Sequence, residues 1–414
     1  MTMHPIIAAL RKHKAGVVLI ALQIALTLAI VCNAVFIIGQ RIERVNRPTG
    51  MDESNLFLVS QQWVGAPGED EPGAVDRLDA MQLEDLAALR AMPDVVSVAP
   101  VNSIPLTDSS WNGSLSVNPR ALSGQTRTTY YFGDEQMLPT MGVRVVAGRG
   151  FNAGDVEHQG FREQRDPAQI IFTRALADKV FPHGAVGKMV YLNGSTKPST
   201  IIGVVQRLQS PSVSSRADDT AWNATLIPAR LDANFSRYLV RAKPGRLDAA
   251  MRAAVPTLYK VNPMRVLDED SVRSFAHIRA KAYAADRGMA MLMGVVALIL
   301  LCVTAAGIVG LTSFWVGQRR RQIGVRRALG ARRIDILRYF QVENLLIAGV
   351  GVVVGVVLAI GLNLWLMSHY EMSRIPVMYV LLGVLAMLAI GQAAVFAPAR
   401  RASNVPPVVA TRAV

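Results

Sequence analysis

Four long apolar runs, separated by polar segments, dominate the hydropathy pattern of the chain. They cover Val17–Ile38, Met289–Val316, Leu345–Met367 and Val377–Ala397. Each run is long enough to cross the apolar part of a bilayer as a helix, which takes about 20 residues. The pattern therefore predicts an integral membrane α-helical protein with four transmembrane helices.

A long polar block, residues 39–288, separates the first two apolar runs and has mixed periodicity. Segments 50–129 and 206–280 each show the order strand, helix, strand, which predicts one βαβ-type subdomain assembled from both ends of the block. Segment 130–205 is rich in glycine and short strand patterns, so a mainly β insertion is expected there. The block is thus predicted to be a large α+β domain of two subdomains.

The third apolar run contains Gly349, Gly351 and Gly355. Small residues at this spacing let helices approach closely, so we expect tight packing within the bundle. No acidic or basic residue lies near the centre of any run. Carriers driven by an ion gradient usually need such a residue, which disfavours that class of transporter.

The net charge of +14 is concentrated beside the apolar runs. Between Arg41 and Arg287 the chain has 29 Lys and Arg against 27 Asp and Glu, so that block is nearly neutral. The excess lies in three short segments, 1–16, 317–344 and 398–414. Basic charge next to apolar runs is typical of cytoplasmic loops, so no nucleic-acid partner is expected.

The same charges predict the orientation. Short basic segments stay in the cytoplasm, whereas long domains are translocated largely regardless of their charge. Both termini and the loop 317–344 are therefore predicted to be cytoplasmic, with block 39–288 and the short loop 368–376 on the opposite side. The first run exceeds a signal-peptide core and no small-x-small cleavage site precedes Arg41, which favours an uncleaved anchor.

We find no sequence pattern for catalysis, a cofactor or a metal ion. Segment Pro182–Met189 resembles a phosphate-binding loop, but Pro182 and Met189 stand where glycine and Ser/Thr are required. Both cysteines, Cys32 and Cys302, lie inside apolar runs. The six histidines form no pair at metal-ligand spacing: His4, His13, His158, His183, His277 and His369. A non-catalytic subunit is expected.

The loop after the second run carries the most specific motif, Gln318–Gly330, which reads QRRRQIGVRRALG. It resembles the loop of the MacB/FtsX-type permease family of ABC transporters. The tail PARRASNVPPVVATR and the block segments MGVRVVAGRGF, ALADKVFPHGAVGK and IIGVV resemble the same family. The resemblance implies that the loop is a coupling helix that docks on an ATPase. The matching positions are Gln322, Ile323, Gly324, Arg326, Arg327, Ala328, Leu329, Gly330 and Ala331.

The resemblance also implies a function. Such a chain would be a multi-pass permease of the bacterial inner membrane, paired with a second copy or a paralogue. A separate ABC ATPase, which holds ATP and magnesium, would drive movement of a periplasmic domain. An adaptor and an outer-membrane channel would then complete an efflux pump. Two alternatives within the family are a lipoprotein-release permease and an FtsX-like permease that signals to a cell-wall hydrolase.

Two features depart from the family pattern. Only about sixteen residues precede the first run, so a nucleotide-binding domain fused there, as in MacB, is not expected. Gln322 stands where the family commonly has glutamate.

The basic and apolar residues of the loop would also suit a helix on the surface of an anionic lipid bilayer. We favour the ATPase, with Leu329 as the apolar anchor and with Arg319 and Arg320 as surface charges.

Overall fold

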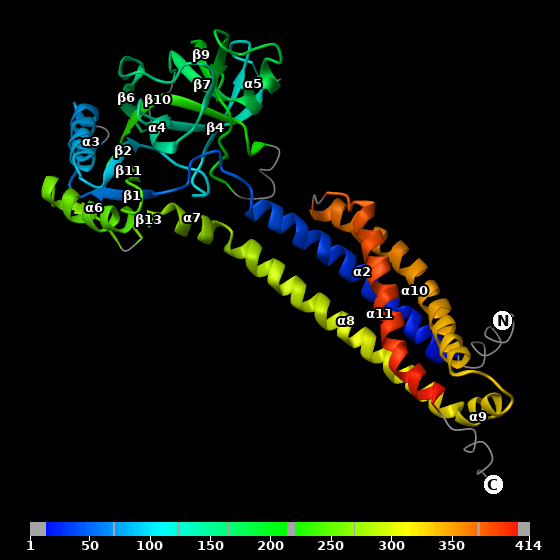
Figure 1. Cartoon of the computed structure of the whole chain (residues 1–414). Helices are drawn as coiled ribbons and strands as arrows, with labels where there is room; N and C mark the ends of the chain where they lie inside the picture. The colour runs from blue at the N-terminus through cyan, green and yellow to red at the C-terminus, as the bar shows by residue number, and fades with distance from the viewer. Residues whose placement is uncertain are drawn as a thin grey trace. The chain divides into compact units, whose positions relative to one another are not determined.

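The structure is a computed structural model that consists of two compact units. It describes residues 14–68, 71–121, 125–161, 163, 166–212, 220–268, 270–370 and 373–404. We call Met1–Asn46 with Ala285–Val414 the helical unit, and Arg47–Ala284 the middle domain. Figure 1 shows the elements of each unit along the chain.

The helical unit contains the four predicted spans, which confirms a four-helix membrane protein. The helices long and apolar enough to cross a membrane are α2 (Lys14–Val45), α8 (Ala284–Gln318), α10 (Arg333–Tyr370) and α11 (Val377–Ser403). Each helix is longer than its apolar run, because polar residues continue it at one or both ends. A short helix, α9 (Arg320–Ala328), lies between α8 and α10 in the chain.

Glycines on α10 allow the close approach of α10 to α2. A Cβ atom on Gly351 would lie 2.7 Å from the carbonyl oxygen of Ala21, and one on Gly355 would lie 3.0 Å from that of Ala25. Any larger residue would push the helices apart. Of the three predicted small positions, Gly351 and Gly355 therefore pack against α2 of the same chain. Gly349 does not, because a Cβ there would meet open space.

The first subdomain of the middle domain is a five-stranded sheet with two helices. Its strand order is β12 (Arg265–Val266), β1 (Leu56–Trp63), β11 (Phe235–Ala242), β2 (Val95–Pro100), and β13 (Val272–Ser274) also pairs with β1. Helices α3 (Ala74–Arg90) and α6 (Leu247–Val261) pack on the sheet around a buried core that includes Phe57, Tyr238, Leu86 and Leu258. Helix α7 (Phe275–Ala282) follows β13.

The two predicted strand–helix–strand segments interleave in this sheet. Strand β11 lies between β1 and β2, and β1 lies between β11 and β12, all in antiparallel pairs. This is the split β-α-β order of ferredoxin-like folds, in which a strand of one segment lies between the two strands of the other. Both ends of the block must therefore meet before the sheet can form.

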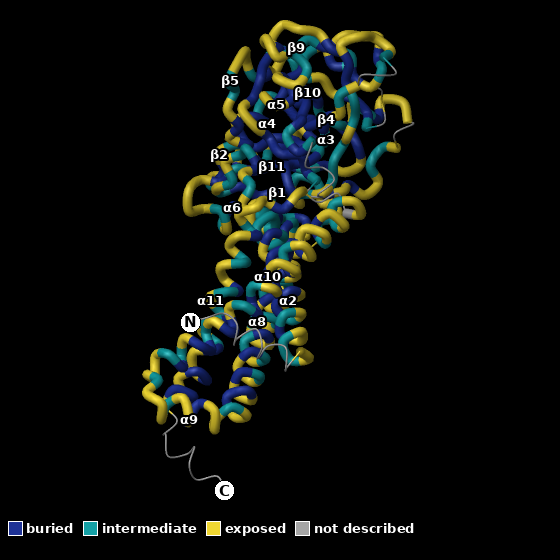
Figure 2. Tube along the Cα trace, turned by 90° about the vertical axis from the view of Figure 1, so that its right-hand side faces the viewer, coloured by how far each residue is buried: buried dark blue, intermediate teal, exposed yellow. Residues whose placement is uncertain are grey.

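The second subdomain is built on an eight-stranded sheet that closes on itself. The path β4-β3-β8-β9-β7-β10 returns to β4, while β5 pairs with β9 and β6 pairs with β10. The strands are β3 (Trp111–Ser116), β4 (Thr126–Gly133), β5 (Val145–Gly148), β6 (Glu157–Gly160), β7 (Gln169–Thr173), β8 (Met189–Leu192), β9 (Ser199–Val205) and β10 (Ala224–Asp232). Short helices α4 (Met137–Met141), η1 (Ala153–Asp155) and α5 (Arg174–Val180) connect them. Figure 2 shows buried positions along these strands.

This β subdomain is longer than the predicted insertion 130–205. Strands β3 and β10 lie outside that range, and β10 is the strand that closes the ring by pairing with both β4 and β7. Because closure depends on pairing between strands far apart in sequence, local patterns could not place these boundaries.

Candidate functional site

The predicted coupling segment folds as α9 followed by a sharp turn. Gly330 has φ +95°, its N–H donates to the Arg327 carbonyl at 3.2 Å, and the Ala331 N–H donates to the Arg326 carbonyl at 3.0 Å. These two bonds form a Schellman cap, which needs a residue with positive φ just beyond the helix. The ALG stretch of the motif is thus the C-terminal cap of α9.

The cap presents Leu329 to solvent. This side chain is 83% exposed, and Val325, one turn earlier, is 45% exposed. Gln322 and Arg326 lie on the same exposed face of the helix. We call Gln322, Val325, Arg326 and Leu329 the α9 surface.

The remaining predicted coupling residues lie elsewhere on the segment. Ile323 and Gly324 are buried, and Ile323 belongs to the apolar core of the helical unit. Arg327 and Ala331 are half-buried, while Ala328 and Gly330 are exposed. Val325 was not among the predicted coupling residues, although it lies within the same motif.

Arg319 is a structural residue, which corrects its interpretation as a surface charge. Its Nη1 donates to both carboxylate oxygens of Glu343, at 2.9 and 3.0 Å. The two side chains are only 12% and 2% exposed, respectively. The pair ties the end of α8 to α10. Arg320 and Arg321, by contrast, are exposed.

Two further arginines of the loop make contacts within the helical unit. The Arg326 guanidinium lies 5.1 Å from the centre of the Tyr339 ring. Arg327 Nη1 donates to the Ser403 carbonyl at the end of α11, at 3.0 Å. Since cations favour helix C-termini, both arginines also suit the last turn of α9.

Segment Pro182–Met189, which resembles a phosphate-binding loop in sequence, forms a turn. Gly184 and Gly187 have φ +113° and +81°, and the Gly187 N–H donates to the Ile201 carbonyl at 2.8 Å. The amide of Gly187 is thus used to attach the turn to β9, and strand β8 begins at Met189.

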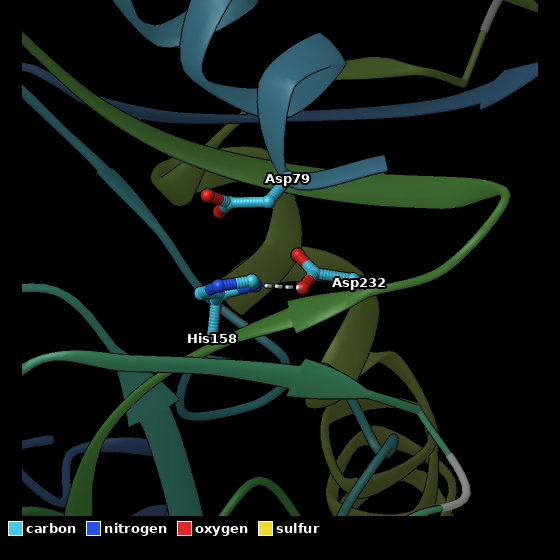
Figure 3. A group of neighbouring side chains, drawn as sticks. All are labelled: Asp79, His158 and Asp232. Carbon is cyan, nitrogen blue, oxygen red and sulfur yellow. Dashed lines mark hydrogen bonds and ion pairs between the residues drawn. The ribbon is translucent and has the colours of Figure 1, made fainter. Parts of the chain in front are cut away.

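Sequence reasoning missed a polar cluster in the middle domain. Asp79 on α3, His158 on β6 and Asp232 on β10 offer ligand atoms within 4.8 Å of one another (Figure 3). His158 Nδ1 lies 3.1 Å from Asp232 Oδ2. Burial raises the pKa of Asp232 to about 7, and the charge of Asp79 acts in the same direction. His158 and Asp232 are 74 residues apart, so no local spacing could reveal the cluster.

Four apolar helices and a separate α/β domain define the class of protein, a multi-pass membrane protein with a large extramembrane domain. A family model described as MacB-like periplasmic core domain matches residues 18–258, and one described as FtsX-like permease C-terminal matches residues 294–407. The chain therefore belongs to the MacB/FtsX-type family of ABC transporter permeases, multi-pass proteins of the inner membrane.

Individual relatives agree with this family. The chain is 27% identical over 364 residues to the pyoverdine export ATP-binding/permease protein PvdT of Pseudomonas entomophila, covering 86% of this chain and 51% of the relative. It is 25% identical over 385 residues to the macrolide export ATP-binding/permease protein MacB of Hyphomonas neptunium, covering 90% and 54%. The chain thus spans about half the length of these relatives.

Solved structures give a weaker likeness. The periplasmic region of MacB from Actinobacillus actinomycetemcomitans aligns with a TM-score of 0.35 at 15% identity, covering 58% of this chain and 97% of that one. The extracellular domain of the transporter YknZ from Gram-positive bacteria aligns with a TM-score of 0.32 at 15% identity, covering 51% and 100%.

Proposed function

We propose that this chain is the membrane subunit of an ABC efflux machine. In this proposal the α9 surface docks on a separate ATPase, which binds ATP and magnesium, and ATP-driven movement is passed through the helices to the middle domain. The relatives are named for pyoverdine export and macrolide export, which supports an exported compound as substrate.

The exposed Leu329 is the observation that carries the proposal. This large apolar side chain is 83% exposed, and the hydrogen-bonded cap fixes the backbone that carries it. Burying it would contribute about 1.5–3 kcal/mol to binding. An aliphatic side chain that fills a pocket on the partner can serve as the anchor of a binding interface.

The structure favours a protein over a lipid surface as the partner of α9. A helix that lies on a bilayer needs a broad apolar face. Here Ile323 is turned into the core, and Val325 and Leu329 share the exposed face with Gln322 and Arg326. The segment also breaks at Gly330, so the apolar pattern from Ile323 onwards is divided between two helices.

The connections of α9 suit the transmission of movement. Arg319 joins α8 to α10, Arg327 joins α9 to the end of α11, and Ile323 packs into the core of the helical unit. A displacement of α9 would therefore reach α8, α10 and α11 together. Helix α8 follows directly on α7 of the middle domain in the chain.

The proposal includes the assembly that the family implies. Both termini and α9 lie in the cytoplasm and the middle domain in the periplasm. A second copy or a paralogue completes the dimer, and an adaptor and an outer-membrane channel receive the exported compound. The uncovered apolar side chains of α8, such as Met291 at 74% and Leu298 at 62% exposed, supply surface for lipid or a second copy.

Leu329→Glu tests the docking. The substitution would place a charge in an apolar contact, which costs several kcal/mol and lowers the affinity about a hundredfold or more. We expect the ATPase that co-purifies with the wild-type chain from native membranes to be lost, while the amount of inserted chain stays unchanged because the side chain is exposed.

Two controls accompany this variant. Val96→Glu introduces the same charge at a 58% exposed apolar position of the middle domain and should retain the ATPase. Arg320→Gln with Arg321→Gln removes exposed charge, which would weaken lipid binding by about 1 kcal/mol per residue but should leave the ATPase bound. Full retention of the ATPase by Leu329→Glu would refute the docking role of α9.

A further inference from the structure

The Asp79–His158–Asp232 cluster joins three elements of the middle domain. Asp79 comes from α3 of the five-stranded subdomain, and His158 and Asp232 come from β6 and β10 of the eight-stranded sheet. Strands β6 and β10 are parallel neighbours. Figure 3 shows the three side chains beside one another, with the dashed line joining His158 and Asp232.

One carboxylate oxygen in this cluster is buried without a donor. The Asp232 side chain has no exposed surface, and its Oδ1 has no hydrogen-bond partner among the described residues. Buried carboxylate oxygens are almost always hydrogen-bonded or bound to a cation. His158 is 37% exposed, so an ion could reach the cluster from solvent.

The cluster has more acidic groups than its arginine partner compensates, which favours binding of a cation. Arg230 Nε and Nη2 donate to the two oxygens of Asp79 at 2.6 and 2.9 Å, which compensates one of the two carboxylates. The Asp232 carboxylate, which contacts the His158 imidazole, remains as a second acidic group of the cluster. Asp76 Oδ1 lies 3.9 Å from His158 Nε2. Metal sites commonly have such outer partners, which orient the ligating carboxylates and histidines.

We propose that Asp79, His158 and Asp232 form a binding site for a divalent transition-metal ion, with Zn²⁺ as the best match. One imidazole nitrogen and two carboxylate oxygens suit Zn²⁺, which accepts three protein ligands and a water molecule. Ca²⁺ and Mg²⁺ prefer sites made of oxygen alone. In this site Arg230 and Asp76 are the outer partners.

The ion would fasten the two subdomains to each other. Asp79 belongs to one subdomain and the other two ligands to the second, so the bound ion adds a cross-link to the Arg230–Asp79 ion pair. Binding to the folded domain alone would stabilise it in proportion to the free metal concentration. This inference is independent of the coupling role of α9.

Metal binding by the full chain tests the site. The protein, purified in detergent without a polyhistidine tag and stripped with EDTA, is titrated with Zn²⁺ and, separately, with Co²⁺. We expect about one equivalent of Zn²⁺ per chain, a rise in the unfolding temperature, and visible Co²⁺ absorption bands of a four- or five-coordinate site. Millimolar Mg²⁺ should not displace the ion.

Substitutions in the cluster test whether the measured Zn²⁺ and Co²⁺ binding takes place there. Asp232→Asn and His158→Gln should each weaken Zn²⁺ binding at least about tenfold and change the Co²⁺ bands. Because the His158 side chain is partly exposed, His158→Gln is expected to fold. It therefore tests the site even if Asp232→Asn does not fold. His277→Ala, which removes an exposed histidine on α7, should bind as the wild type does. Absence of stoichiometric binding by the wild type, or unchanged Co²⁺ bands in His158→Gln, would overturn the proposal.

Discussion

Breaking the Arg319–Glu343 pair should destabilise the helical unit far more than removing any exposed arginine of the same loop. With contacts of 2.9 and 3.0 Å, the direct attraction is roughly 6 kcal/mol at an effective dielectric constant of 20. Much of this offsets the cost of taking both charges out of water. Arg319→Met, however, leaves the carboxylate of Glu343 buried and unpaired, which costs about 3–5 kcal/mol.

The double variant distinguishes an ion pair from simple packing. Arg319→Met with Glu343→Met removes both charges and should recover most of the stability, because two apolar side chains replace the pair at similar volume. Arg320→Met is the matched control, since Arg320 is exposed and an exposed ion pair contributes at most about 1 kcal/mol.

The apparent unfolding temperature of the detergent-purified chain, followed by size-exclusion chromatography of heated samples, is measured for the wild type and the three variants. ATPase co-purification is measured in parallel. We expect Arg319→Met to have the lowest unfolding temperature, with the double variant close to the wild type. Equal losses in the single and the double variant would refute the role of charge pairing, and an unchanged single variant would refute its importance altogether.

Two other predictions concern topology and pH. In a cysteine-free background, Thr196→Cys on an exposed turn should react with a membrane-impermeant thiol reagent in intact spheroplasts. Asn404→Cys should react only after the spheroplasts are lysed. The reverse result would show that the orientation is inverted. Burial raises the pKa of Asp134 to about 6 despite its ion pair with Arg90, so the folded chain keeps this proton to higher pH than the unfolded chain does. The stability due to this proton is complete below about pH 4 and is lost as the pH rises through 6, so the wild type should lose roughly 2–3 kcal/mol relative to Asp134→Asn between pH 4 and 7. Parallel pH profiles of unfolding temperature for the two proteins would contradict this.

The sequence alone was sufficient for the membrane architecture. A span needs only a run of apolar residues and satisfies its backbone hydrogen bonds within itself, so hydropathy located all four helices. The C-terminal cap of α9 could also be predicted from the sequence, because a glycine directly after a helical pattern, here Gly330, commonly marks the end of a helix. The family of the chain followed from the motif around that glycine.

Only the tertiary structure decided which side chains of these elements are exposed and which are held in contacts within the chain. Arg319 and Arg320 are neighbours in a run of arginines, yet one is paired with the buried Glu343 and the other is exposed. The closing strand β10 and the Asp79–His158–Asp232 cluster likewise depend on residues that are far apart in the chain. Local periodicity predicts which face of a helix or strand is buried. Ion pairs, the closure of a β-sheet and clusters of possible metal ligands form where elements distant in sequence pack together, so a local pattern cannot predict them.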